Sequence, residues 1–136
     1  MEKLKLAGCI VKDLEGNILL LHRNTAKRQQ WEIPGGKLDP DEDAKKTAAR
    51  EVREEAGIEV EIISELGTRE FNEDSFTMIY TWFLAEIIDG VASIQEPRVH
   101  DQCGYFSVEA LKEMSSELSP NARNFLDEIT AGRLAI

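Results

Sequence analysis

One acidic segment constrains the fold of this 136-residue chain more than any other stretch. It runs from Gly35 to Ile58 and reads GGKLDPDEDAKKTAAREVREEAGI. Asp39 followed by Pro40 predicts a helix start there, because aspartate caps free backbone N–H groups and proline suits the first helical position. Gly57 predicts the end, since glycine readily takes the left-handed conformation that closes helices. The segment is therefore expected to be a helix held between two loops.

The acids of this helix fall on one face. Glu51, Glu54 and Glu55 stand at i, i+3 and i+4, so their side chains project together. A solvated acidic surface is the ordinary explanation of a Glu-rich helix, but such a surface gains from Lys four residues after Glu. Here Glu51, Glu55 and Glu59 repeat like charges at that spacing, which costs about 0.2–0.5 kcal/mol per pair. The pattern favours carboxylates that converge on hard divalent cations such as Mg²⁺.

A fixed spacing of residues runs through the same segment. It consists of Gly36, five residues, Glu42, seven residues, and then Arg50, Glu51, Val52, Glu54, Glu55, Gly57 and Ile58 at their printed positions. This spacing reproduces every fixed position of the Nudix box, so the chain resembles the Nudix hydrolase family, and within it the MutT-like branch. At average residue frequencies such a match arises by chance about once in 10⁸ starting points.

The resemblance implies an α/β/α sandwich with a central mixed β-sheet, in which the box forms a loop–helix–loop. The length fits one domain over residues 1–136. Periodicity and turn residues predict the other elements. We expect strands over Leu4–Val11 and Ile18–Leu21 that form a hairpin, a polar loop over Arg23–Gln30, strands over Ile58–Ile63 and Phe76–Ile88, and helices over Val108–Met114 and from Ser119 to about Thr130.

The composition limits the binding partners and the cellular location that can be expected. The formal net charge of −10 argues against nucleic-acid polymers, because their binding depends on Lys and Arg that neutralise phosphates. The N-terminal apolar run is interrupted by Lys5, and no stretch is long enough to span a membrane, so neither a signal peptide nor a membrane partner is expected. Cys9 and Cys103 match no metal spacing and are expected to be buried free thiols. A cytoplasmic location fits these observations.

The resemblance also implies the chemistry. In similar enzymes the box binds Mg²⁺ or Mn²⁺, and a water attacks one phosphorus of a nucleotide diphosphate bridge. Glu51, Glu54 and Glu55 match the family's metal-binding glutamates, and the Gly35 carbonyl lies where a further ligand is often found. Arg50 is expected to orient a box glutamate through a charge-assisted hydrogen bond. The implied catalytic set is Glu51, Glu54 and Arg50.

Three assignments around the box stay open. Glu51 is the first choice for the general base, although a downstream carboxylate takes that role in some members. Glu42 could cap the helix, support the metals from behind, or do both. Similar proteins often carry an extra acidic ligand before the last strand, but Gln102 stands near that position, which leaves Glu96 or Asp101 as candidates.

Substrate contacts are implied at three positions. Arg23 and Lys37 match residues that contact phosphates in the MutT-like branch, with solvated cations as the alternative. The stretch SPNARNFL, 119–126, resembles the late helix start where MutT-like enzymes use an Asn to read an oxidised guanine. Asn121 is therefore the candidate base reader.

An aromatic stripe offers a second way to hold a base. Phe76, Tyr80 and Trp82 share one strand face at a period of two residues and could stack on a base. Aromatic side chains on strands more often belong to the core. The sequence favours the core over the base-stacking role.

Three functions follow. The leading one is a metal-dependent pyrophosphohydrolase that cleaves nucleoside triphosphates, oxidised purine nucleotides included, because the marks of ADP-ribose and NADH hydrolases are missing. The second is hydrolysis of another nucleoside diphosphate-linked substrate, such as a nucleotide sugar or dinucleotide. The third is a non-catalytic nucleotide sensor, against which the intact box counts. A small nucleotide is the expected partner, and the sequence is compatible with a homodimer.

Overall fold

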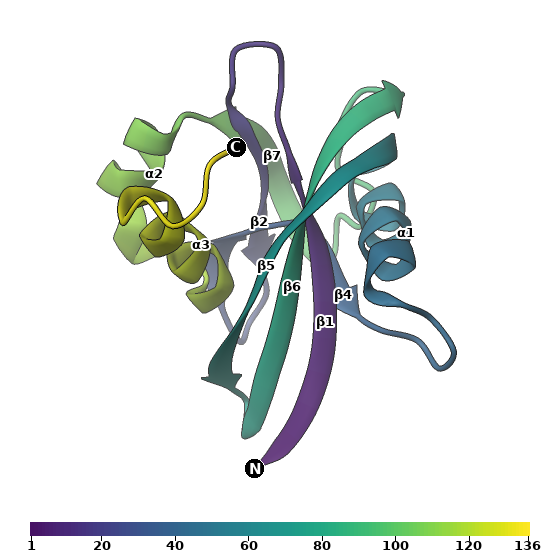
Figure 1. Ribbon diagram of the computed structural model, residues 1–136, viewed down its shortest axis with the longest axis vertical. Coiled ribbons are helices and arrows are strands. Elements are labelled where there is room, and N and C mark those ends of the chain that lie inside the picture. The colour runs from purple at the N-terminus through teal and green to yellow at the C-terminus, as the bar shows by residue number, and fades with distance from the viewer.

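The chain folds into two β-sheets that lie between helices. In the computed structural model, which describes residues 1–136, the strands are β1 (Glu2–Val11), β2 (Ile18–Asn24), β3 (Gln29–Glu32), β4 (Gly35–Lys37), β5 (Glu59–Glu73), β6 (Phe76–Asp89) and β7 (His100–Phe106). The helices are α1 (Ala44–Ala56), α2 (Val108–Glu113) and α3 (Pro120–Thr130). Helix α1 lies on one side of the strands, with α2 and α3 on the other (Figure 1). The predicted α/β/α sandwich is confirmed.

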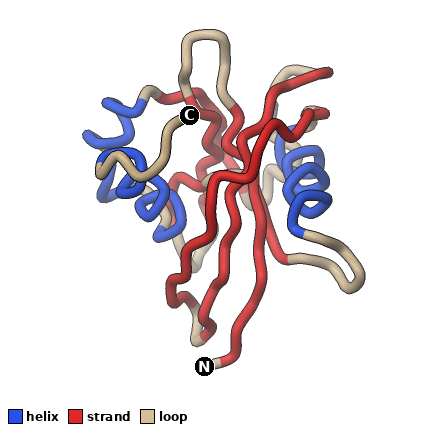
Figure 2. The backbone as a smooth tube through the Cα atoms, in the orientation of Figure 1, coloured by secondary structure: helices blue, strands red, loops and turns tan.

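The two sheets differ in size and direction of pairing. The larger sheet has the strand order β4-β1-β6-β5 and the smaller has the order β3-β2-β7. Strand β1 pairs parallel with β6 and antiparallel with β4, so the larger sheet is mixed as predicted. Strands of both sheets fill the middle layer between the helices (Figure 2). No helix is long and apolar enough to cross a membrane.

Successive residues of the central strands face opposite helical layers, because side chains alternate along a strand. On β1, Cys9 packs in the cluster that includes α1, whereas Ile10 packs in the cluster that includes α3. On β6, Phe83 and Trp82 divide in the same way. Residues 7–11 of β1 and 78–85 of β6 are covered on both faces, which explains why these parts of the two strands are almost continuously apolar.

The predicted hairpin between the first two strands is wrong. The turn itself forms, since Asp13 Oδ1 accepts hydrogen bonds from the backbone N–H groups of Glu15 and Asn17. Beyond an isolated bridge between Lys12 and Ile18, β1 and β2 enter different sheets. Strand β1 instead pairs with β4 and β6, and β6 is distant in the sequence.

The predicted start of the acidic helix at Asp39 is also wrong. Helix α1 begins at Ala44, and its N-cap is Asp43, whose carboxylate accepts a backbone N–H of the first turn at 2.8 Å. Asp39 and Glu42 form a separate turn, in which each backbone N–H bonds to the other residue. Asp41 lies between them at a φ of 67°, a left-handed conformation that a helix cannot continue through.

Helix ends elsewhere agree with the sequence. Gly57 closes α1 with a φ of 72°. Ser119 is the N-cap of α3, and its Oγ accepts the N–H of Ala122 at 3.1 Å. Helix α2 ends at Glu113, one residue short of the prediction.

Strand lengths were underestimated. The polar loop predicted over Arg23–Gln30 is shorter, because β2 runs on to Asn24 and β3 begins at Gln29. The strand predicted over Ile58–Ile63 continues to Glu73 as β5, and the short strand β4 was not predicted. The two cysteines are free, as expected, with Cys9 buried and Cys103 only half-buried.

Candidate active site

Arg50 lies at the centre of the acidic face of α1. Its Nε and Nη2 donate to the two oxygens of Glu42 at 2.8 and 2.9 Å. Its Nη1 donates to Glu51 Oε1 at 3.0 Å and to Glu54 Oε2 at 3.1 Å. Nη2 also donates to the carbonyl of Lys37 at 3.3 Å. One cation thus offsets the repulsion among three carboxylates and links α1 to β4.

Glu42 connects the loop before α1 to this cation. Hydrogen bonds from Arg50 and then from Thr47, whose Oγ1 lies 2.6 Å from Glu42 Oε1, lower the pKa of Glu42 to about 2. Glu42 also accepts the backbone N–H of Asp39. The carboxylate therefore closes the turn and holds Arg50 at the same time.

Glu55 faces the glycine loop instead of Arg50. Its Oε1 accepts the backbone N–H of Gly35 at 2.8 Å. Burial raises the pKa of Glu55 well above its ordinary value, the Gly35 N–H opposes the rise, and the negative charge of Glu51 adds to it. Burial likewise raises the pKa of Glu51, against the effect of Arg50. Both carboxylates therefore bind a proton more readily than an exposed glutamate does.

Two glycines allow the close approach between the loop and the acids. A Cβ on Gly36 would lie 2.6 Å from the Glu51 carboxylate, and a Cβ on Gly35 would lie 2.0 Å from the Tyr80 hydroxyl and 2.5 Å from the carbonyl of Ala7. No side chain could be added at either position without moving its neighbours. The glycine pair therefore lets the acidic face and the strands of the larger sheet meet at one place.

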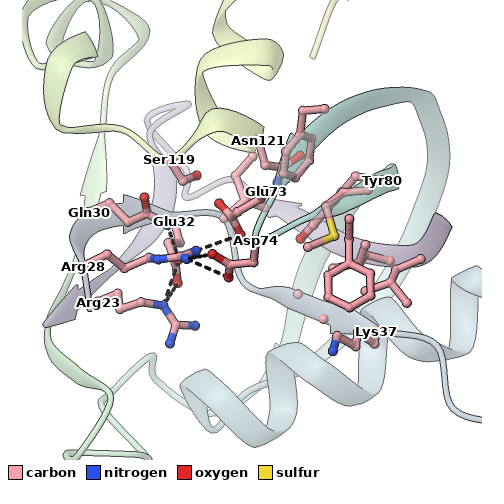
Figure 3. A pocket seen from close by; sticks show the side chains of 18 of the residues that line it. Arg23, Arg28, Gln30, Glu32, Lys37, Glu73, Asp74, Tyr80, Ser119 and Asn121 are labelled. Atoms are coloured by element: carbon pink, nitrogen blue, oxygen red, sulfur yellow. Dashed lines mark hydrogen bonds and ion pairs between the residues drawn. The ribbon is translucent and has the colours of Figure 1, made fainter. Parts of the chain in front are cut away.

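A cavity of about 370 Å³ opens on the other side of this glycine pair. Gly35 and Gly36 form part of its wall, and the three predicted substrate contacts, Arg23, Lys37 and Asn121, line it as well. Figure 3 shows these three side chains around one space, although they come from β2, β4 and α3. The structure thus brings together residues that the sequence places almost a hundred positions apart.

Only one of the three guanidinium nitrogens of Arg23 is hydrogen-bonded within the protein. Its Nε donates to both oxygens of Glu32, at 3.0 and 2.9 Å, while its Nη1 and Nη2 make no hydrogen bond. Burial would raise the pKa of Glu32, but the neighbouring His100, Arg23 and Gln30 hold it below its ordinary value. Glu32 therefore stays ionised and fixes the guanidinium, with its two outer nitrogens free for an anion. Lys37 forms no ion pair and is exposed.

Asn121 is buried at the start of α3. Its Oδ1 accepts the Nε1–H of Trp82 at 2.9 Å, whereas its Nδ2 makes no hydrogen bond within the protein. Trp82 is 1% exposed and packs edge-on against Phe125 in the core, so it does not reach the cavity. Of the aromatic stripe, only Phe76 and Tyr80 line the cavity.

The two candidates for an extra acidic ligand occupy different surroundings. Asp101 Oδ1 pairs with His22 Nδ1 at 2.7 Å, and Asp101 Oδ2 accepts Asn24 Nδ2 at 2.8 Å. The charge of Glu96 adds to the rise in the pKa values of Glu51 and Glu55, after burial and the nearer charges. Asp101 is thus already committed to two partners away from the acidic helix.

Sequence reasoning missed an ion-pair cluster at the cavity. Arg28 binds Glu73 and Asp74, and all three line the cavity. No local pattern indicates these contacts, because Arg28 and Asp74 are 46 positions apart. The sequence indicated only that Arg28 lies in a polar loop, which does not predict its partners.

The acidic face offers a cation only carboxylate and carbonyl oxygens. In this conformation no group of three or more acidic, His or Cys side chains could hold a metal ion. Arg50 bridges Glu51 and Glu54, while Glu55 accepts the Gly35 N–H, so the three carboxylates have different partners. The donors are all oxygens, which suits Mg²⁺ or Mn²⁺. The residues therefore fit such an ion in kind, and its binding would replace part of the Arg50 contacts.

Known proteins resemble this chain over most of its length. The model of the NUDIX domain family matches residues 3–129. The crystal structure of a MutT NUDIX hydrolase from Burkholderia pseudomallei superposes with a TM-score of 0.84 at 25% identity, over 95% of this chain and 99% of that one.

Curated relatives match over shorter segments. The chain is 34% identical over 83 residues to a diphosphoinositol polyphosphate phosphohydrolase of Homo sapiens, covering 60% of this chain and 45% of the relative. It is 38% identical over 64 residues to the CTP pyrophosphohydrolase of Escherichia coli strain K12, covering 46% and 47%. The chain thus spans less than half the length of these relatives.

Proposed function

Because the chain belongs to the Nudix hydrolase family, we propose that it is a metal-dependent pyrophosphohydrolase that cleaves nucleoside triphosphates to the monophosphate and pyrophosphate. One observation carries the proposal. The glycine pair Gly35–Gly36 has the acids of α1 on one side and a cavity lined by Arg23, Lys37 and Asn121 on the other. A diphosphate bridge at the glycine pair would lie beside both sets of residues.

The acidic face supplies the hydrolytic half of the site in this proposal. Glu51, Glu54, Glu55 and the Gly35 carbonyl would hold Mg²⁺ or Mn²⁺. When bound, such an ion would neutralise phosphate charge and lower the pKa of an attacking water. Glu51 would take up a proton from water as general base.

Arg50 has a positioning role in the same half. It holds Glu51 and Glu54 from one side while Glu42 fixes the guanidinium from the other. Charge-assisted hydrogen bonds of this kind are short and directional, so they keep both carboxylates oriented.

The cavity supplies the nucleotide-binding half. The free Nη1 and Nη2 of Arg23 and the unpaired ammonium of Lys37 bind phosphate oxygens. Asn121 Nδ2 donates to an acceptor on the base edge, since Oδ1 is already used by Trp82. A donor at this position suits the oxygen on C8 of oxidised guanine, an acceptor that normal guanine lacks.

The test follows the loss of each substrate and the formation of its products by chromatography. The panel contains the four ordinary nucleoside triphosphates, 8-oxo-dGTP, a nucleotide sugar, a dinucleoside tetraphosphate and a diphosphoinositol phosphate, each with Mg²⁺ and with excess EDTA. We expect the largest kcat/KM for a nucleoside triphosphate and no turnover in EDTA. Binding of nucleotides without turnover of any substrate in Mg²⁺ or Mn²⁺ would instead indicate a nucleotide sensor.

A second candidate is hydrolysis of a different diphosphate-linked substrate. The match to a human diphosphoinositol polyphosphate phosphohydrolase favours it, because that relative is named for a substrate without a nucleoside. The mixture of apolar and polar side chains around the cavity favours a nucleoside instead, since a highly phosphorylated inositol offers little apolar surface. The same panel decides between the two.

A further inference from the structure

Three charged residues join the two sheets at the edge of the cavity, and we name Arg28, Glu73 and Asp74 the clasp. Arg28 Nη1 lies 2.8 Å from Glu73 Oε1, and Arg28 Nη2 lies 2.6 and 2.7 Å from the two oxygens of Asp74. Figure 3 shows the contacts from this guanidinium to both carboxylates as dashed lines. The contacts have the short, forked geometry of strong arginine–carboxylate pairs.

The clasp links two parts of the chain whose other ion pair is the one between Lys27 and Asp74. Arg28 lies in the loop between β2 and β3 of the smaller sheet, whereas Glu73 ends β5 and Asp74 begins the turn to β6 of the larger sheet. Among all ion pairs of the structure, only those of Arg28 and its neighbour Lys27 join the two sheets. Separation of the sheets at this end of the cavity therefore requires these pairs to break.

Both sides of the clasp are held in place by their own backbone. Thr25 Oγ1 and the Thr25 N–H donate to the carbonyl of Arg28, which fixes the loop that carries the guanidinium. Asp74 and Ser75 have φ values of 51° and 67°, in the left-handed region that costs side-chain-bearing residues energy. Glycine would occupy this turn without that cost, and the carboxylate of Asp74 is the group that reaches Arg28.

The exposure of the charged groups places the clasp where the cavity meets solvent. The side chains of Arg28 and Glu73 are 21% and 23% exposed, whereas those of Asp74 and Lys27 are 37% and 67% exposed. All four residues line the cavity. The hydrogen bonds to Asp74 raise the pKa of Arg28, and the bond from Arg28 lowers the pKa of Asp74, so both groups stay ionised near neutral pH.

We infer that the clasp is a specificity-determining element that holds the cavity to the width of one nucleoside and selects against substrates with a second bulky group. The inference rests on the proposed function and names its substrate class more narrowly. The cavity volume of about 370 Å³ lies near the lower end of the range of about 300–1,000 Å³ for ligand pockets. A larger substrate would need a wider gap between the sheets.

The experiment opens the clasp by two opposite changes of charge. Arg28→Gln removes the cation, and the double variant Glu73→Gln, Asp74→Asn removes the anions, with shapes almost unchanged. Lys112→Gln is the matched control, because it removes a surface ion pair with Glu109 on α2, away from the cavity. For each protein, kcat/KM is measured with ATP and with diadenosine tetraphosphate, which carry the same base.

Both clasp variants are expected to raise the ratio of kcat/KM for diadenosine tetraphosphate over ATP roughly tenfold, as loss of a small network of ion pairs allows. The control should leave the ratio unchanged. In the wild type the ratio should rise with NaCl, because salt screens partly exposed pairs. Hydrogen exchange of the amides in 72–77 should be faster in both clasp variants, which reports the opening without any substrate.

The outcomes separate this inference from the proposed function. A wild type that hydrolyses ATP well, with variants whose ratio does not change, would overturn the inference alone. Shifts of the ratio in opposite directions in the two variants would overturn it as well, since simple charge effects would then explain them. A wild type that prefers diadenosine tetraphosphate over every nucleoside triphosphate would overturn both.

Discussion

Trp82 Nε1 donates a hydrogen bond to Asn121 Oδ1 at 2.9 Å, and both side chains are buried. The bond joins β6 to the first turn of α3 and gives the indole N–H its partner. It also fixes the amide so that only Nδ2 is unpaired. Asn121 therefore contributes to folding as well as to the proposed reading of the base.

The folding role predicts a stability effect. Asn121→Ala should lower the free energy of unfolding by about 1–3 kcal/mol, because the buried N–H of Trp82 loses its acceptor. Urea denaturation measures the change. Asn124→Ala is the matched control, since Asn124 is half-buried on the same helix and its side chain makes no hydrogen bond. An equal loss in both variants would show that the bond to Trp82 adds nothing.

The base-reading role needs a variant that keeps this bond. Asn121→Asp retains an acceptor for Trp82 but replaces the free donor with an oxygen. The ratio of kcat/KM for 8-oxo-dGTP over dGTP should change by about ten- to a hundredfold, because a hydrogen-bonded position discriminates strongly. If every nucleotide loses activity by the same factor, Asn121 does not read the base.

The acidic face predicts a separation of turnover from stability. The side chain of Glu54 is 51% exposed and its partner in the structure is Arg50, so Glu54→Gln should change the free energy of unfolding by no more than about 0.5 kcal/mol. Turnover in Mg²⁺ should fall by at least about 10²-fold if Glu54 holds the ion. Thermal melts and steady-state kinetics test both statements. A variant that unfolds would mark the carboxylate as structural.

Glu42 predicts a dependence of stability on pH. Its pKa is about 2 in the folded protein, mainly through the bond from Arg50, against about 4.3 for an unperturbed glutamate. The folded pKa is lower, so Glu42 stabilises the fold above about pH 4.3 and this contribution is lost as pH falls towards 2. Glu42→Gln should therefore lower the Tm at pH 7 and differ little from wild type near pH 2. Glu109→Gln, at an exposed pair, should show no such convergence.

The parts of the molecule that could be predicted from sequence are those set by local spacing. The acids of α1 follow from i, i+3 and i+4 positions, and the ends at Gly57 and Ser119 follow from capping chemistry. The predicted start at Asp39 failed because two aspartates compete as caps, and the left-handed Asp41 separates them. Local patterns cannot rank such neighbours when a turn intervenes.

Contacts between distant segments could not be predicted in the same way. The parallel pairing of β1 with β6 and the ion pairs of the clasp join residues far apart in the sequence, and helical or strand periodicity relates only near neighbours. Arg23, Lys37 and Asn121 were predicted only through the family resemblance, and the structure places them on one cavity. The bond of Asn121 to Trp82 gave no local signal, since 39 positions separate the two residues.

The tight packing around Tyr80 gives the last prediction. A Cβ on Gly8 would lie 2.2 Å from the Tyr80 hydroxyl and 2.4 Å from the carbonyl of Pro34. Gly8→Ala should therefore destabilise the fold by about 1–3 kcal/mol or more. Tyr80→Phe should be neutral or stabilising, because the buried hydroxyl has no hydrogen-bond partner. Gly104→Ala is the control, since its Cβ would make only ordinary contact with a side chain.

The double variant Gly8→Ala, Tyr80→Phe identifies which contact costs more. Removing the hydroxyl relieves one clash, but the Pro34 carbonyl belongs to the backbone that leads into Gly35 and accepts the Cys9 N–H. The double variant should therefore recover only part of the lost stability in urea denaturation. Full recovery would show that the Tyr80 hydroxyl is the sole obstacle, and that the chain before the glycine pair can shift without cost.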